Sequence, residues 1–269
     1  MLQNAASMYR PEDLLIATIA SMLDGLGHVA VGAASPVPGA AALLARARSQ
    51  DRLRVSLLGS RRHNAFTDGG KELFDCAAEG RIDAFFLGGA QIDGEANINL
   101  VGVGGYPKAK ARFPGSFGSS YLYFLVPRVI LFSLEHTSRV MVPKVDFISA
   151  PGVSPDGVYR PGGPFALVTN RCVFSFDRKA GRFSLLTAHP GEDLASIRNN
   201  TGFEFDAPER VPETPAPGEL DLQLLRGRVG RQIAEVYPAF AKRVWNIEEE
   251  NEAEHPAAST EESIGSRFY

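Results

Sequence analysis

The sequence predicts an α/β fold with an open, mostly parallel sheet flanked by helices. Segments with helical spacing of apolar residues alternate with short apolar segments from the start of the chain, as they do in sheets whose neighbouring strands run parallel. Glycine and polar residues cluster directly after one short apolar segment, where such sheets place their ligand loops. The chain has 269 residues, of which 44% are hydrophobic, and this length allows a large core.

The first half of the chain begins with a predicted helix. Pro11 is suited to the first helical position, Glu12 and Asp13 favour the first turn, and Gly25 or Gly27 ends the helix. The elements predicted next are a strand at 28–32, a loop at 33–39, a helix at 40–48, a strand at 53–58, a loop at 59–70, a helix at 71–79 and a buried strand at 84–87.

The second half is richer in predicted strands. Hairpin turns are expected at 169–171 and 177–182, because turn-forming residues separate short apolar segments there. The strands predicted are 128–134, 145–149, 165–169, 172–176 and 183–187, and the helices are 193–198 and 220–229. We expect residues 1–247 to form a single α/β domain, and the acidic residues 248–269 to be disordered or to contact a partner.

Composition excludes several classes of protein. The net charge of −3 does not fit a general nucleic-acid binder or an electrostatic membrane binder. No segment has the roughly 20 apolar residues of a membrane span, and the N-terminus does not resemble a signal peptide. Cys76 and Cys172 stand far apart, and no metal-ligand spacing occurs. We therefore expect a cytoplasmic protein with two reduced thiols and no metal.

The first candidate site directly follows the apolar strand at 84–87. It comprises Gly88, Gly89, Ala90, Gln91 and Asp93, followed by Asn97 and Asn99. Ligands bind at the carboxyl ends of strands in open α/β sheets, so this segment is predicted to be a ligand loop. The alternative is a tight turn in which glycines and amides cap the backbone.

A second candidate site lies at 104–120. Lys108, Lys110 and Arg112 would point to one side of an extended segment. They would contact either the phosphates of a ligand or a partner, unless they are simply solvated. The following loop, with Gly115, Ser116 and Gly118, offers unhindered N–H donors for an oxyanion.

Taken together, these segments resemble the β subunits of family I CoA-transferases of the glutaconate CoA-transferase type. The resemblance covers residues from about 11 to 206. The matching residues are 88–93, Asn97, Asn99, Lys110, 112–116, Gly118, 144–146, 149–152 and 200–206.

The resemblance implies a sheet of the type also found in sugar-phosphate isomerases. It implies a heterodimer or heterotetramer with an α subunit, an active site between the two subunits, and an acyl-CoA thioester as substrate without a tightly bound cofactor. In the transferases of this family, a β-subunit glutamate after a strand attacks the thioester, which is covalent catalysis. The glycine loops would stabilise the oxyanion.

The chain departs from the family at that glutamate. No Glu or Asp stands between Asp51 and Asp68. Arg61 or Arg62 would hold a substrate carboxylate there, or His63 would relay protons, unless the loop is only solvated. Three readings stay open besides CoA transfer: a hydrolase of ring-opened CoA thioesters with its carboxylate on the α subunit, a non-catalytic CoA-binding or scaffold subunit, and a sugar-phosphate isomerase or deaminase.

Two further histidines follow predicted strands. His136 stands beside Glu135, and a structural hydrogen bond is the favoured role for it over catalysis. His189 precedes Pro190 and is expected to orient a loop. No arrangement of a nucleophile, a base and an orienting group can be built from the sequence.

Overall fold

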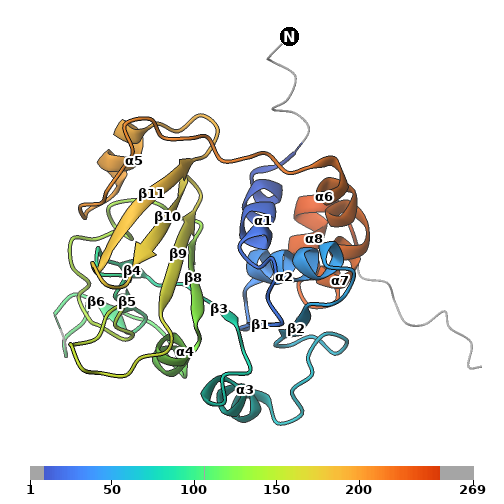
Figure 1. Ribbon diagram of the computed structural model, residues 1–269, viewed down its shortest axis with the longest axis horizontal. Coiled ribbons are helices and arrows are strands. Elements are labelled where there is room, and N and C mark those ends of the chain that lie inside the picture. The colour runs from blue at the N-terminus through green and yellow to red at the C-terminus, as the bar shows by residue number, and fades with distance from the viewer. Residues whose placement is uncertain (1–8, 106, 249–269) are drawn as a thin grey trace, which may run out of the picture.

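The computed structural model describes residues 9–105 and 107–248. Its centre is a seven-stranded sheet in the order β11-β10-β9-β8-β3-β1-β2 (Figure 1). Its strands are β1 (His28–Val31), β2 (Arg54–Leu57), β3 (Ala84–Leu87), β8 (Arg128–Ser133), β9 (Pro164–Thr169), β10 (Cys172–Asp177) and β11 (Arg182–Ala188). The strands from β2 to β9 run parallel, and the β9–β10 and β10–β11 pairs are antiparallel. The predicted mostly parallel α/β sheet is confirmed.

The central strands are buried on both faces, which explains their uninterrupted apolar sequences. All four residues of β1 and of β3 are buried. Successive side chains of a strand point to opposite faces. Phe86 accordingly packs into the core on one side of the sheet, whereas Phe85 and Leu87 pack into the core on the other side.

Helices from both ends of the chain cover one face of the sheet (Figure 1). They are α1 (Pro11–Ser21), α2 (Pro36–Arg48), α6 (Glu219–Leu224), a π-helical turn (Leu225–Val229), α7 (Gly230–Ala234) and α8 (Pro238–Trp245). Polar contacts join the two ends. The Arg48 guanidinium donates two hydrogen bonds of 2.8 Å to Asp221, and Trp245 Nε1 donates one of 2.8 Å to Asp13.

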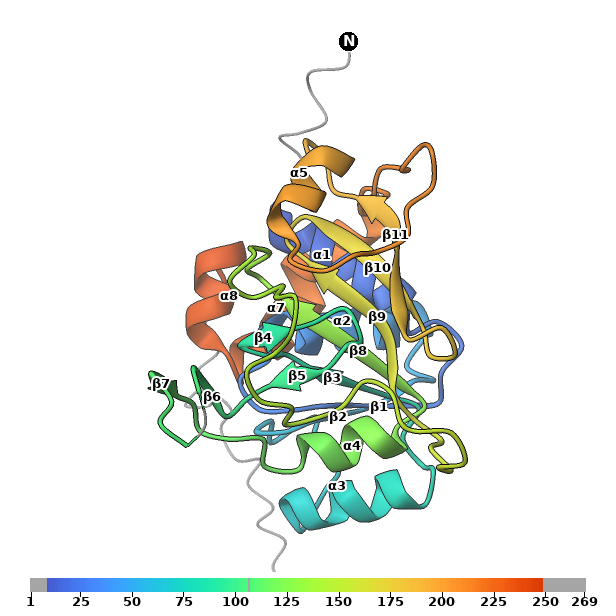
Figure 2. The ribbon, with the colours of Figure 1, turned by 90° about the vertical axis from the view of Figure 1, so that its left-hand side faces the viewer.

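Two helices and two small hairpins lie on the opposite face, where Figure 2 shows α3 and α4 side by side. These elements are α3 (Gly69–Ala78), α4 (Ser119–Leu125), the hairpin of β4 (Gln91–Ile92) with β5 (Ile98–Asn99), and the hairpin of β6 (Gly102–Val103) with β7 (Ala111–Arg112). The short helix α5 (Leu194–Asn200) follows β11. Among the described residues, none of the helices is long and apolar enough to cross a membrane.

The strand predicted at 145–149 is wrong. This segment lies across the β4–β5 hairpin, and side chains of the hairpin accept the hydrogen bonds of its backbone. Val145 N–H donates to Asp93 Oδ2 at 3.3 Å, and Asp146 N–H donates to Gln91 Oε1 at 3.0 Å. Ser149 N–H donates a 2.9 Å hydrogen bond to the carbonyl of Ile98 in β5, but this contact belongs to an isolated bridge and not to a strand pairing, which an apolar pattern cannot reveal.

Several helix boundaries also differ from the prediction, and α1 ends at Ser21 rather than at Gly25 or Gly27. The helix α2 begins at Pro36, inside the predicted loop, because proline fits the first helical position. The helix α4 begins at Ser119, inside the predicted glycine loop. The helix predicted at 220–229 ends at Leu224, and a π-helical turn with Gly227 in a non-helical conformation follows it. Apart from Glu248, the predicted tail at 248–269 lies outside the described residues.

Candidate active-site edge

The carboxyl ends of the parallel strands meet at one edge of the sheet, as they must when neighbouring strands point the same way. The loops that begin there follow β1, β2, β3 and β8. Each exposes backbone or an apolar side chain: Ala33 and Ala34 after β1, Gly59 after β2, Gly88 after β3 and Leu134 after β8. This edge is where ligands of open α/β sheets bind. We refer to it below as the site edge.

The loop after β2 is organised by a carboxylate from the other end of the chain. Glu235, which directly follows α7, accepts a 2.7 Å hydrogen bond from the Ser60 hydroxyl. It also accepts hydrogen bonds from the backbone N–H groups of Arg61 at 2.7 Å and Arg62 at 3.2 Å. Partial burial would raise the pKa of Glu235, but these hydrogen bonds outweigh burial and lower the pKa below its ordinary value.

The loop then turns back along the free edge of β2. Leu57 N–H donates a 2.8 Å hydrogen bond to the carbonyl of His63, and His63 N–H donates one of 2.8 Å to the Ser60 hydroxyl. His63 is half-buried, with Nδ1 3.4 Å from Arg46 Nη1. Burial and the Arg46 charge lower the pKa of His63. His63 is therefore neutral near pH 7, and Arg46 favours the tautomer with its proton on Nε2.

Four of the predicted ligand-loop side chains form a buried network inside the β4–β5 region. Asn99 donates 2.7 Å to Gln91 Oε1, and Asn97 donates 3.2 Å to Asp93 Oδ2. The remaining oxygens accept from nearby backbone, including Gly152 N–H on Asn97 Oδ1 at 3.1 Å. These side chains hold the hairpin against the 145–152 segment. Any contact of theirs with a ligand remains a prediction.

The glycines beside them have separate roles. A side chain at Gly89 would place its Cβ 2.5 Å from Ile98 Cγ2 and 2.8 Å from the Gln91 carbonyl oxygen, so this glycine permits close packing of the hairpin. Gly88 is exposed, and a Cβ there would meet the carbonyl of Phe132 at 3.2 Å. Ala90 N–H donates a 2.9 Å hydrogen bond to the carbonyl of Asn99. Gly88 is thus the predicted loop residue that presents its backbone at the site edge.

The second predicted glycine loop lies against the start of α3. Gly115 has φ +103°, and Phe117 has φ +44° although it is not a glycine. A Cβ at Gly118 would collide with the ring of Phe74. The Phe117 ring packs 5.6 Å from Phe74 and remains 88% exposed. The neighbouring Ser116 carbonyl accepts a 2.7 Å hydrogen bond from Ser119 N–H, which starts α4.

The three predicted cations lie on the exposed β6–β7 hairpin. They do not form one extended segment, which corrects the prediction. Only Ala111–Arg112 pairs as a strand, with Val103 and Gly102, whereas Lys108 and Lys110 stand in the connection before it. Glycine and proline in the connection explain the turn. Arg112 donates a 2.7 Å hydrogen bond to the Pro107 carbonyl.

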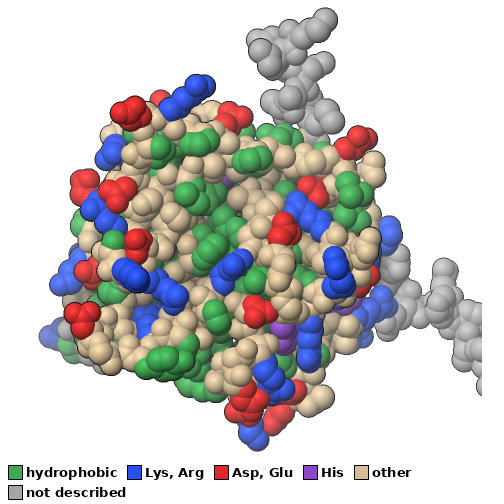
Figure 3. Space-filling view, in the orientation of Figure 1, with side chains coloured by type: hydrophobic (Ala, Val, Ile, Leu, Met, Phe, Trp, Pro, Cys, Tyr) green, Lys and Arg blue, Asp and Glu red, His purple; other side chains and the backbone are tan. Residues whose placement is uncertain are grey.

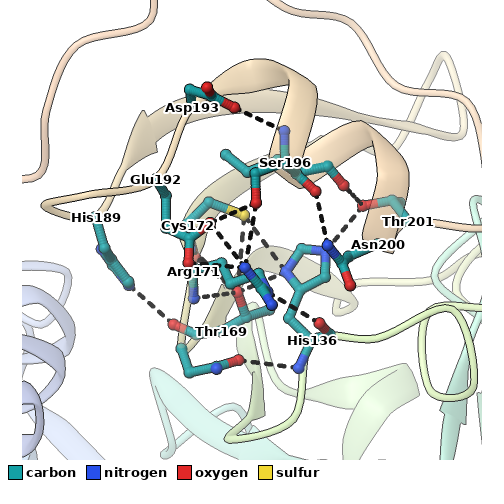
Figure 4. A network of polar contacts seen from close by, with 12 residues as sticks. His136, Thr169, Arg171, Cys172, His189, Glu192, Asp193, Ser196, Asn200 and Thr201 are labelled. Atoms are coloured by element: carbon teal, nitrogen blue, oxygen red, sulfur yellow. Dashed lines mark hydrogen bonds and ion pairs between the residues drawn. The ribbon is translucent and has the colours of Figure 1, made fainter.

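A buried polar network lies where β8 and β9 end, beneath α5 (Figure 4). His136 Nδ1 lies 2.8 Å from Thr169 Oγ1, and His136 Nε2 lies 2.8 Å from Thr201 Oγ1. Burial lowers the pKa of His136 to about 4, with the charge of Arg171 adding to the effect. Burial also raises the pKa of Cys172, 3.6 Å from His136 Nδ1, to about 12. A neutral histidine and a protonated thiol with buried partners indicate a structural role, as the sequence favoured.

His189, which follows β11, and Glu135, which follows β8, also have partners within the chain. Both ring nitrogens of His189 have partners, with Nδ1 2.8 Å from Thr214 Oγ1 and Nε2 2.9 Å from the Thr169 carbonyl. His189 therefore orients its loop. Glu135 is paired with Arg139, whose Nη2 donates a 2.6 Å hydrogen bond to it. Among the described residues, no group of three or more His, Cys, Asp or Glu side chains could hold a metal ion.

Sequence reasoning missed Glu235. It identified the loop after β2 as lacking a carboxylate, and the loop itself does lack one. The carboxylate that reaches the loop comes from a residue 175 positions from Ser60. No motif or spacing joins the two, so only the packing of the last helices against the site edge reveals it.

Comparison with known proteins identifies the family. A family model described as Coenzyme A transferase matches residues 11–200. The chain belongs to the coenzyme A transferase family. Within it, the chain is similar to the B-type subunits of family I enzymes, so the resemblance read from the sequence is confirmed. The matched residues end before α6, and Glu235 therefore lies outside them.

Relatives in the coenzyme A transferase family have different activities. The B-type chain of the 3-oxoadipate CoA-transferase of Pseudomonas knackmussii is 35% identical over 161 residues, which are 58% of this chain and 62% of the relative. The cholesterol ring-cleaving hydrolase IpdB subunit of Rhodococcus jostii is 29% identical over 160 residues, again 58% and 62%. The aligned segments thus span less than two thirds of either relative.

A solved structure extends the similarity over more of the chain. The crystal structure of the decarboxylase AibA/AibB superposes with a TM-score of 0.70 at 25% identity, covering 87% of this chain and 98% of that one. Transferase, hydrolase and decarboxylase are therefore all represented among the similar proteins. The fold does not select among these reactions.

Proposed function

We propose that this chain is the B-type subunit of a two-subunit enzyme that acts on acyl-coenzyme A thioesters, and that its partner supplies the catalytic carboxylate. The A-type partner and the substrate class are taken from the names of the relatives and from the family. The position of the carboxylate is taken from the geometry of the site edge.

The observation that carries this proposal is the bound state of Glu235 and Glu135, two carboxylates near that edge. Glu235 accepts hydrogen bonds from one hydroxyl and two backbone N–H groups. Glu135 is bound by the guanidinium of Arg139 and by the hydroxyl of Thr137. A carboxylate stabilised by several donors is a weak nucleophile and a weak base. Neither residue is therefore suited to attack a thioester.

The same observation favours a reaction other than simple CoA transfer. Transfer through an enzyme-bound anhydride needs a carboxylate on this subunit that can form and break a covalent bond. A hydrolase or decarboxylase that uses a carboxylate of the partner has no such need. We place this chain with those members.

In this proposal the chain binds and orients the thioester. The exposed backbone of Gly88, at the carboxyl end of β3, would lie beside the acyl group. The backbone N–H groups of the 115–118 loop would face the thioester oxygen, where negative charge develops during attack. Lys108, Lys110 and Arg112 are exposed on a projecting hairpin and would contact CoA phosphates or the partner subunit.

An exposed apolar surface along α4 supports a partner. Phe117 is 88% and Tyr121 44% exposed, and a cavity of about 540 Å³ opens beside Tyr121, Phe124 and Leu125. Figure 3 shows hydrophobic side chains gathered on the lower edge of the molecule, where α4 lies in Figure 1. Exposed apolar patches of this kind mark interaction sites. We call Phe117, Tyr121, Phe124 and Leu125 the α4 surface.

The test is to express the chain with its A-type partner and to assay the purified complex against a panel of acyl-CoA thioesters. We expect the complex to consume a thioester and the isolated chain to be inactive, because the active site lies between two subunits. A CoA ester of an added acceptor acid would identify transfer, whereas release of CO2 with an acyl-CoA shorter by one carbon would identify decarboxylation. Products that have gained water, formed without an acceptor acid, would identify hydrolysis. Turnover by the isolated chain would contradict the proposal.

The partner surface is tested separately. Tyr121→Glu places a charge on the α4 surface and should prevent co-purification with the partner. Leu220→Glu is the matched control, because Leu220 is 64% exposed but lies on α6, on the other face of the sheet. Equal retention of the partner by both variants would show that it binds elsewhere.

A further inference from the structure

We infer that Glu235 is a positioning residue of the site edge, which holds the Ser60–His63 loop in place from the C-terminal helices. The inference rests on the proposed function, since it assigns a role in that site. It concerns a residue beyond the part of the chain that the family model matches.

Glu235 engages four successive residues of the loop, directly or through Ser60. Its carboxylate accepts from the Ser60 hydroxyl and from the amides of Arg61 and Arg62. Ser60 Oγ in turn accepts from the amides of Arg62 at 3.2 Å and His63 at 2.8 Å. Ser60 is only 5% exposed, and the Glu235 side chain only 9% exposed. The loop therefore wraps around one carboxylate and one hydroxyl.

Val236 and Tyr237, the two residues after Glu235, also lie against loops of the site edge. Val236 Cγ1 lies 3.7 Å from the position of a Cβ on Gly59, the exposed residue that follows β2 and Leu58. Tyr237 accepts a 3.2 Å hydrogen bond from Ser35 N–H, in the loop after β1. Glu235 and Tyr237 thus bond to the loops that follow two neighbouring parallel strands, β2 and β1, and Val236 lies beside Gly59.

The helices do not depend on Glu235 for their own attachment. Asp221 binds Arg48 of α2 through two hydrogen bonds of 2.8 Å, and Trp245 binds Asp13 of α1. Leu225, Val229 and Ile233 are fully buried in the core. With the helices fixed by these contacts, Glu235 can act as a fixed point for a loop that has no regular structure of its own.

The position of this loop matters because its side chains lie at the edge of the sheet where a ligand would bind. The loop follows β2 at the edge where ligands of such sheets bind. It carries two cationic side chains, Arg61 and Arg62, and the neutral His63. A misplacement of about 1 Å in a site can lower a rate by about 100-fold. Loss of Glu235 should therefore impair turnover even when the rest of the protein stays folded.

The experiment compares Glu235→Ala, Ser60→Ala and Asp221→Asn in the full chain, with the A-type partner present for kinetics. Asp221→Asn is the matched control: it weakens an ion pair of the same helical segment without touching the loop. Hydrogen exchange at the Arg61, Arg62 and His63 amides measures how firmly the loop is held. We measure how well the site works by kcat and KM, using the acyl-CoA that the wild-type complex consumes fastest.

We expect Glu235→Ala to accelerate exchange of these amides at least about tenfold and to lower kcat about 100-fold, with a smaller change in KM. Asp221→Asn should leave the amide exchange rates and kcat unchanged. The effects of Ser60→Ala and Glu235→Ala on amide exchange and on kcat should be non-additive in the double variant, because the two residues belong to one network.

The outcomes separate this inference from the proposed function. Faster exchange with kcat at the wild-type level overturns the inference, since Glu235 would then serve the fold alone. Unchanged exchange in Glu235→Ala overturns it as well. A wild-type complex that consumes no CoA thioester overturns the proposed function, and the role of Glu235 in it falls too. If Glu235→Ala does not fold, Glu235→Gln, which retains one acceptor oxygen, replaces it in the same comparison.

Discussion

His136 and Thr169 are joined across the ends of two neighbouring parallel strands, with His136 Nδ1 2.8 Å from Thr169 Oγ1. The ring is only 1% exposed, and its other nitrogen lies 2.8 Å from the hydroxyl of Thr201. The contact fixes the chain that leaves β8 against the turn that leaves β9. It also keeps an ionisable group away from water.

We expect this burial to make the fold sensitive to acid. The pKa of His136 falls from 6.5 to about 4, chiefly through burial. Above pH 6.5 the ring is neutral in both states and the stabilisation is complete. As the pH falls from 6.5 to 4, the unfolded chain binds a proton that the folded chain does not, so stability decreases, by up to about 3 kcal/mol from this group. Urea unfolding at pH 7 and at pH 5 measures the loss.

His136→Gln is the variant that isolates this effect. It should be less stable at pH 7, because the ring leaves Thr169 and Thr201 without their partner, but it should lose less stability between pH 7 and pH 5. Some pH dependence will remain, since burial also lowers the pKa values of His28, His63 and His189. An unchanged pH dependence in the variant would assign the acid sensitivity to other groups.

A side chain at Gly89 should damage the fold itself. Gly89→Val would bring a Cβ to 2.5 Å from Ile98 and 2.8 Å from a backbone carbonyl, and a carbonyl cannot move aside cheaply. We expect a loss of several kcal/mol in the free energy of unfolding, by analogy with overpacked cores. Thermal unfolding of the two proteins tests this.

Gly105→Ala is the control for that variant. It lies in the same glycine-rich region, has no atom within 4 Å of the added Cβ and does not have a positive φ. Its unfolding temperature should stay close to that of the wild type. If Gly89→Val were equally stable, the close packing of the hairpin would not be needed for folding.

Local sequence patterns predicted the sheet well because its central strands are buried on both faces. Uninterrupted apolar segments such as Ala84–Leu87 have few alternatives to a buried strand between helices. The turns at 169–171 and 177–182 were likewise predicted from residues that favour turns, and the antiparallel pairing of β9, β10 and β11 confirms them. Such features depend on neighbours in sequence.

The features that local patterns do not reveal depend on the packing of the whole chain. The apolar segment at 145–149 is not a strand, and Gln91 and Asp93, more than 50 residues earlier, accept the backbone hydrogen bonds of Asp146 and Val145. The site loop after β2 could be located from the sequence, but its arrangement around Glu235 could not. Asn97 and Asn99 bond to Asp93 and Gln91 in the same hairpin, and their spacing alone does not disclose these bonds, while their contact with a ligand stays a prediction.

Asp93 should prove important for stability. Its carboxylate accepts hydrogen bonds from Asn97 N–H at 3.0 Å, Glu95 N–H at 3.2 Å and Val145 N–H at 3.3 Å, and Asp93 is only 4% exposed. Asp93→Ala would leave buried donors without an acceptor, at a cost of about 2–3 kcal/mol. Chemical unfolding measures this change. The exposed Asp156, replaced by Ala, should show almost none.

This subunit should form no covalent intermediate with the acyl group. After incubation of the complex with acyl-CoA and then with borohydride or hydroxylamine, the mass of this chain should be unchanged. The reason lies in the hydrogen bonds of two carboxylates near the site edge. Glu235 is bound by Ser60 and two amides, and Glu135 by Arg139. Forming an anhydride at either residue would first require breaking these charge-assisted hydrogen bonds, which are among the stronger ones in proteins.

A trapped adduct mapped by peptide sequencing to Glu235 or Glu135 would show that this subunit carries the nucleophile. An adduct confined to the partner would agree with a carboxylate supplied from there.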